Sequence, residues 1–171
     1  MDKLIIINLI VGFLVWLPLI YLFMALAEYI AHRWFMHKKT VLTIYEYKTH
    51  TVEHHGRKVN SPMYPYVDLS IRYHLLYGSP GIAAFLVGHF VFDRQYALGG
   101  LACLLSMFVF HSQVYSKIHR ATHELEKNWA EHLPYYERMK QHHLLHHRYP
   151  SKNFAVIFLW TDSLFGTKVR S

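Results

Sequence analysis

The sequence contains almost no cysteine and little charge. Cys103 is the single cysteine among 171 residues, so the chain can form no intramolecular disulfide and no multi-cysteine zinc or iron–sulfur site. Charged residues make up 17% of the chain and hydrophobic residues 53%, a balance that excludes an intrinsically disordered protein. A metal ion bound by this chain must therefore be held mainly by side chains other than cysteine.

Asp, Glu, Lys and Arg are absent from three stretches, Leu4–Ala27, Tyr73–Phe92 and Gln95–Ser116. The first can cross a hydrocarbon core of roughly 30 Å at about 1.5 Å per residue, and it is longer than the roughly 7 to 15 residues of a signal-peptide core. Asp93 and Arg94 separate the other two, which predicts a hairpin of membrane helices. We therefore expect an all-α, integral membrane helical bundle with about three transmembrane helices.

The basic residues predict how the chain is oriented. Only Lys3 precedes the first span and only Arg94 lies between the second and third, whereas the other Lys and Arg residues follow the first or the third. By the positive-inside rule, 32–72 and 117–171 face the cytoplasm as a helical, histidine-rich cap, and the N-terminus lies outside. The net charge of +7 is explained by this topology, and no motif indicates a nucleic-acid partner. The length fits a single domain, 1–171.

Fifteen histidines stand out in this sequence, and most of them lie in the two predicted cytoplasmic segments. Repeated spacing identifies ten of them as candidate metal ligands: His32, His37, His50, His54, His55, His119, His123, His143, His146 and His147. Isolated histidines are more often surface or hydrogen-bonded residues, the interpretation we give to His74, His89 and His132. Clustered histidines can also sense pH, but such a sensor does not require repeated spacing.

Helical geometry predicts how these histidines are shared between ions. Residues four apart lie on one face of an α-helix, so His50 with His54, and His119 with His123, can converge on one ion. Adjacent histidines point about 100° apart and can reach two neighbouring ions, as a dinuclear centre requires. His32 and His37 are five residues apart and are poorly aligned on a straight α-helix. The doubled His142 and His143 leave the first ligand of the last box open.

Imidazole suits zinc, copper, iron and nickel, and of these we favour two iron ions, for which zinc may substitute. Iron activates oxygen, whereas zinc has no redox chemistry. The histidine boxes at 32–37, 50–55, 119–123 and 142–147 are followed by Asn153-Phe-Ala and by a run from Trp160 to Thr167. In this order they resemble the fatty acid hydroxylase and sterol desaturase superfamily of membrane di-iron enzymes.

The resemblance covers roughly 20–168 and implies a cytoplasmic di-iron centre of eight to ten histidines, with dioxygen as oxidant. It also implies a separate electron donor, such as a cytochrome b5-like or ferredoxin-type reductase system, because the chain has no haem, dinucleotide or cysteine-cluster motif of its own. The expected reaction is hydroxylation or desaturation of a lipid hydrocarbon chain, fatty acyl or sterol-like.

Departures from the superfamily pattern include three residues between His50 and His54, where two are common, and Ala155 where Gly is usual. The chain is also similar to bacterial carotenoid hydroxylases, so a carotenoid ring hydroxylase is one alternative. A non-catalytic metal-binding membrane protein is another, from a different class. An oxygenase should consume lipid with reductant and oxygen, whereas a metal carrier should exchange zinc without product.

Overall fold

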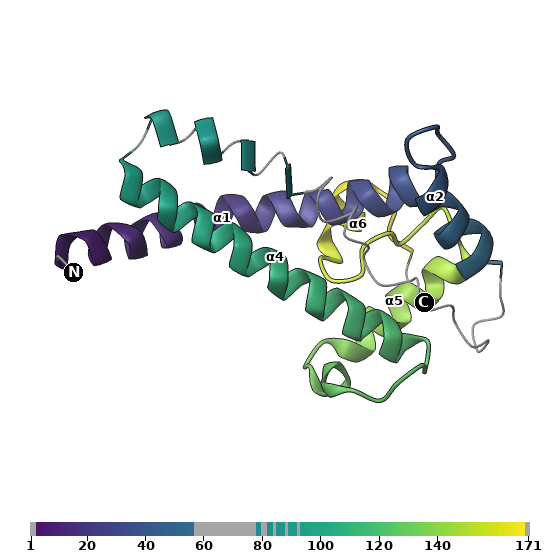
Figure 1. Ribbon diagram of the computed structural model, residues 1–171. Coiled ribbons are helices and arrows are strands. Elements are labelled where there is room, and N and C mark those ends of the chain that lie inside the picture. Colours follow the sequence, from purple (N-terminus) through teal and green to yellow (C-terminus); the bar gives the residue numbers. More distant parts are fainter. Residues whose placement is uncertain are drawn as a thin grey trace. The chain divides into compact units, whose positions relative to one another are not determined.

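The computed structural model describes residues 3–56, 78–79, 82–83, 85–87, 89–91 and 93–169. All regular structure in these residues is helical, which confirms the predicted all-α class (Figure 1). The elements are α1 (Lys3–Ile30), the π-helical turn η1 (Ala31–Met36), α2 (Ile44–Tyr47), the π-helical turn η2 (Lys48–His54), α4 (Arg94–Thr122), the 3-10 turn η4 (Trp129–His132), α5 (Tyr136–Arg148) and α6 (Trp160–Leu164).

Two of these helical stretches are long and apolar enough to cross a membrane. They are Lys3–Met36, which joins α1 to η1, and Arg94–Thr122, which is α4. They contain the predicted first and third spans. Half of the predicted second span, 73–92, lies outside the described residues, and the described half is helical. A third transmembrane helix therefore stays a prediction.

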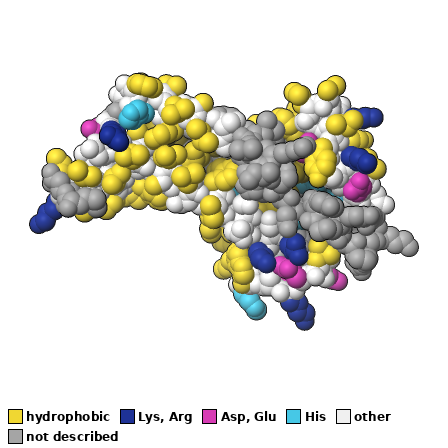
Figure 2. Space-filling model, in the orientation of Figure 1, with side chains coloured by type: hydrophobic (Ala, Val, Ile, Leu, Met, Phe, Trp, Pro, Cys, Tyr) yellow, Lys and Arg dark blue, Asp and Glu magenta, His cyan; other side chains and the backbone are white. Residues whose placement is uncertain are grey.

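The chain forms two compact units, a first unit of 1–24 with 70–112 and a second unit of 25–69 with 113–171. In the first unit the backbones of α1 and α4 approach closely at glycines. A Cβ atom on Gly99 would lie 2.3 Å from the Leu9 carbonyl oxygen, and one on Gly12 would lie 2.6 Å from that of Tyr96. Small residues permit this approach between membrane helices. Hydrophobic side chains predominate on the face of this unit drawn in Figure 2.

The second unit has its own apolar core, to which α4, η4, α5 and the segment before α6 contribute. Its buried members are Val114, Tyr115, Ile118, Ala130, Met139 and Val156. Asn128 starts η4 with a capping box, since its side chain accepts from the Ala130 N–H and its own N–H donates to Glu131. This core fixes the C-terminal part of α4 against α5, and both helices carry predicted ligands.

Candidate metal centre

Two π-helical turns carry the histidines of the N-terminal half. His32 lies in η1 and His37 follows its last residue, whereas His50 and His54 lie in η2 and His55 follows it. The His55 N–H donates to the His50 carbonyl at 3.0 Å, a bond between residues five apart. A π-helical turn is wider than an α-helical one, so it brings residues five apart nearer to one face. His32 and His37 can therefore bind one ion together, and so can His50 and His55.

Nine of the ten predicted ligands fall into two groups. Within each group the candidate ligand atoms all lie within 4.8 Å of one another. Group 1 consists of His32, His37, His50, His55 and His146. Group 2 consists of His54, His119, His123 and His143. The tenth histidine, His147, lies beside group 2, with its Nε2 atom 3.2 Å from Nε2 of His143.

The division of the histidines differs in one respect from the expectation based on α-helical spacing. His50 and His54 were expected to converge on one ion, but they lie in different groups, because the π-helical turn pairs His50 with His55 instead. His119 and His123, four apart on regular α4 geometry, share group 2 as expected. The rule of four residues therefore holds where the helix is α and fails where it is π.

The two groups are contiguous, and both lie in the second unit. The imidazole centroids of His50 and His54 are 5.1 Å apart, and those of His54 and His55 are 5.5 Å apart. His55 and His147 stack with centroids 4.4 Å apart. Adjacent histidines thus connect one group to the other, which is the arrangement that a dinuclear centre needs.

The nitrogen positions fit bound metal ions. The Nε2 atoms of His32 and His50 are 2.8 Å apart, and those of His123 and His143 are 3.0 Å apart. Two nitrogens that bind one ion at about 2.1 Å and at right angles lie roughly 3 Å apart. Among the described residues, Nε2 of His54 and Nε2 of His119 are buried without a hydrogen-bond partner. Each such atom costs about 1–3 kcal/mol, a penalty that an ion would remove.

Burial keeps these imidazoles neutral, which is the form that binds metals. It lowers the pKa of His37 to about 4, and together with the neighbouring imidazoles it lowers the pKa of His55 to about 3. The same two causes, burial first, hold the pKa of His54, His143 and His146 well below the ordinary value. At neutral pH the centre is therefore a set of uncharged lone-pair donors.

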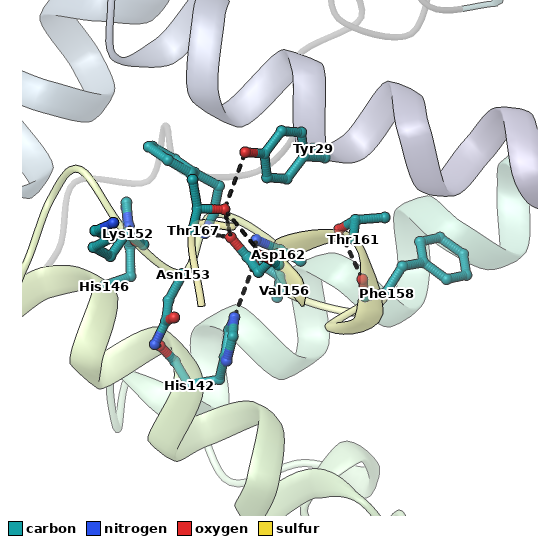
Figure 3. A network of polar contacts seen from close by, with 12 residues as sticks. Tyr29, His142, His146, Lys152, Asn153, Val156, Phe158, Thr161, Asp162 and Thr167 are labelled. Carbon is teal, nitrogen blue, oxygen red and sulfur yellow. Dashed lines mark hydrogen bonds and ion pairs between the residues drawn. The ribbon is translucent and has the colours of Figure 1, made fainter. Parts of the chain in front are cut away.

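Backbone carbonyls of the segment after α5 orient two members of group 1. Nδ1 of His146 donates to the Lys152 carbonyl at 2.7 Å (Figure 3), and Nδ1 of His32 donates to the Phe154 carbonyl. A carbonyl can only accept, so in both rings the proton is on Nδ1 and the lone pair is on Nε2. Ligand histidines are commonly fixed in this way by a second hydrogen bond.

The doubled histidines of α5 have different partners. His143 belongs to group 2, whereas Nε2 of His142 lies 2.9 Å from Oδ2 of Asp162 (Figure 3). Asp162 is fully buried. Burial raises the pKa of this carboxyl, but hydrogen bonds from His142, Thr167 and the backbone outweigh that effect and lower it. The arrangement favours His143 as the ligand of the last box.

Sequence reasoning did not single out Asp162. The available signal was that an acidic residue inside an otherwise apolar run, here 153–165, must find partners when it is buried. Oε1 of Glu28 accepts backbone N–H groups of the segment before α6, from Val156 at 2.8 Å and from Ile157 at 2.9 Å. Glu28 therefore anchors that segment.

The histidines predicted to have no metal-binding role lie apart from both groups where they are described. His132 is exposed at the end of η4, and His89 is also exposed. His74 lies outside the described residues. His111 is buried in α4 and belongs to neither group.

Comparison with known proteins adds one finding. The sequence model of the family described as fatty acid hydroxylase matches residues 17–167, a range that includes every histidine of groups 1 and 2. No curated protein and no solved structure matches the chain.

Proposed function

The chain belongs to the fatty acid hydroxylase family, and from this premise we propose that it is a membrane oxygenase that hydroxylates or desaturates the hydrocarbon chain of a lipid. The substrate is a fatty acyl or sterol-like lipid and the oxidant is dioxygen. A separate donor, cytochrome b5-like or of the ferredoxin-reductase type, supplies the electrons. The two apolar helices and the family together indicate a membrane protein.

One observation carries this proposal: two contiguous groups of buried imidazoles in one compact unit. Group 1 would hold one ion, and group 2 with His147 would hold the second. Iron, when bound, supplies the one-electron and dioxygen chemistry that unactivated carbon–hydrogen bonds require, whereas zinc has no redox chemistry. An all-nitrogen donor set is compatible with both metals, so we propose iron on the basis of the reaction.

The chain itself presents neutral imidazoles and orients them. It also places the ligands where its candidate spans end, since His32 follows α1 by two residues and His119 lies near the end of α4. We propose that the lipid chain approaches the metal ions of groups 1 and 2 from within the bilayer. By the distribution of Lys and Arg, we propose that these groups face the cytoplasm.

The function can be tested by comparing the lipids of membranes from cells that express three forms of the protein. Wild type and His132→Ala should both yield a hydroxylated or desaturated lipid, because His132 is exposed and outside both groups. His146→Ala should yield none. A hydroxylated carotenoid as the product would instead identify the protein as a carotenoid ring hydroxylase. Zinc exchange without any oxidised product would support the non-catalytic metal-binding alternative.

The proposed topology has its own test. With three spans, a tag at the N-terminus should be accessible from outside the cytoplasmic membrane, whereas a tag after Ser171 should be protected. Accessibility of both tags from the same side would require an even number of spans and would contradict the topology.

A further inference from the structure

We propose that Asp162 is a positioning residue for group 1 alone: it holds the 152–155 segment, whose carbonyls orient His32 and His146, and it thereby controls retention of one of the two ions. The inference rests on the proposed two-metal centre and adds to it a residue that binds no metal. It also predicts that the two ions are held with different dependence on the C-terminal segment.

The carboxylate of Asp162 accepts four hydrogen bonds. Oδ1 accepts from the Phe154 N–H at 2.8 Å. It also accepts from the Thr167 hydroxyl at 2.6 Å (Figure 3). Oδ2 accepts from the Ala155 N–H at 2.7 Å and lies 2.9 Å from Nε2 of His142. With these partners the buried carboxylate ties the backbone at 154–155 both to α5 and to the residue that follows α6 by three positions.

The backbone held in this way is the one that contacts group 1. Lys152 and Phe154 provide the two carbonyls for His146 and His32. Asn153 lies between them at a φ of 53°, a left-handed conformation that asparagine tolerates better than most residues. Its N–H donates to the Thr167 carbonyl at 3.0 Å, so the turn that aims both carbonyls depends on the same surroundings as Asp162.

His143 of group 2 lacks this form of support among the described residues. Nδ1 of His143 has no hydrogen-bond partner, in contrast with Nδ1 of His146 one turn later on α5. His119 and His143 are fully buried on long helices packed around the apolar core of the second unit. Helix packing therefore orients group 2, and loss of the Asp162 contacts should leave it in place.

Asp162→Asn is a sharp test because the side chain keeps its size and loses one acceptor. Each carboxylate oxygen receives one backbone N–H, from Phe154 on Oδ1 and from Ala155 on Oδ2. An amide has one acceptor oxygen and one NH2 group. Whichever way it turns, the NH2 group faces a backbone N–H, and the 154–155 segment loses one of its two anchors.

The experiment measures cobalt or zinc per chain in purified full-length protein during dialysis against increasing chelator. Wild type should hold two ions. Asp162→Asn should keep its helical circular dichroism and release one ion at about 10- to 100-fold lower chelator concentration, the usual effect of losing an outer-sphere partner. Glu126→Gln is the control, since this carboxylate contacts Lys117 and Arg120 and not the 152–155 segment. It should behave as wild type.

Double variants identify the ion that remains. On the Asp162→Asn background, His37→Ala in group 1 should remove no further ion, whereas His123→Ala in group 2 should remove the remaining one. If Asp162→Asn does not fold, Thr167→Val deletes one of the four hydrogen bonds, and it should release the same ion with a smaller shift.

Retention of both ions by Asp162→Asn as in wild type, equal loss of both, or dependence of the remaining ion on His37 would each overturn the inference while the two-metal proposal stands. A folded Thr167→Val protein identical to wild type would do so as well. A wild-type protein that holds fewer than two ions would overturn the proposed function and this inference together.

Discussion

The first unit packs α1 against α4 through glycines that let two backbones meet, whereas the second unit is organised by buried imidazoles and carboxylates. In the first unit, a larger residue at position 99 is excluded because an added Cβ atom would lie 2.3 Å from a backbone oxygen. In the second unit, replacement of Asp162 is restricted because its two oxygens must accept several hydrogen bonds. Size therefore decides what the first unit tolerates, and donor or acceptor identity decides what the second tolerates.

This difference reflects the surroundings of each unit. Helices in a bilayer gain little from hydrophobic burial against one another, so close van der Waals packing must hold them together. Buried polar groups in the second unit are costly unless each is paired or bound to an ion. The first unit should thus be sensitive to added volume, and the second to lost ligands, lost hydrogen bonds and added protons.

The largest effect is expected from removing one ligand from either side of the centre. His146→Ala and His147→Ala should each leave about one ion per chain and abolish product formation, because His146 is in group 1 and His147 lies beside group 2. Elemental analysis alongside product formation checks this. Full activity of His147→Ala would show that the tenth histidine is not a ligand.

A smaller effect is expected from added volume in the first unit. Gly99→Ala places a methyl group against the α1 backbone, and overpacking of this kind costs about 1–3 kcal/mol. Gly78→Ala is the matched control, since its Cβ would lie 3.8 Å from the Phe108 ring, an ordinary contact. Thermal midpoints in detergent should fall for Gly99→Ala only. Equal midpoints for the two variants would remove the contrast between the units.

Acid should weaken the second unit of the metal-free protein. Burial lowers the pKa of His37 to about 4, whereas an unfolded histidine has a pKa of about 6.5. Between these values the unfolded chain binds more protons than the folded one, so the free energy of unfolding falls as the pH drops below about 6.5. The thermal midpoint of metal-free protein should therefore be lower at about pH 5.5 than at about pH 7.5. A constant or rising midpoint would contradict this.

The smallest effects are expected from histidines outside the two groups. His142→Ala should retain both ions in the absence of chelator, because His142 supplies only one of the four hydrogen bonds to Asp162. Against chelator it should release the group 1 ion with only a small shift, as expected for Thr167→Val. His132→Ala should change neither metal content nor product formation, since this side chain is exposed. Metal analysis of both variants beside wild type checks the ranking. Loss of both ions from His132→Ala would show that the ligand assignment is incorrect.

Much of the candidate site could be predicted because it depends on residue type and order. The charge-free runs predicted helices that the structure shows at Lys3–Met36 and Arg94–Thr122. Paired and adjacent histidines predicted two neighbouring groups, and His54 and His55 do belong to different ones. The assignment of each histidine to group 1 or group 2 was harder to predict, because it depends on whether each helical turn is α or π. No residue in 31–36 or 48–54 indicates the wider π-helical turn.

The sequence by itself determined the chemistry: neutral nitrogen donors in large number, one cysteine, and apolar segments long enough for a bilayer. These properties belong to the side chains themselves and do not depend on the local backbone conformation. Only the tertiary structure decided that His50 pairs with His55, and that Asp162 holds the carbonyls facing His32 and His146. Every residue has a carbonyl, so the sequence cannot say which one meets a ligand. For His32 that depends on how two segments 122 residues apart in the chain are brought together.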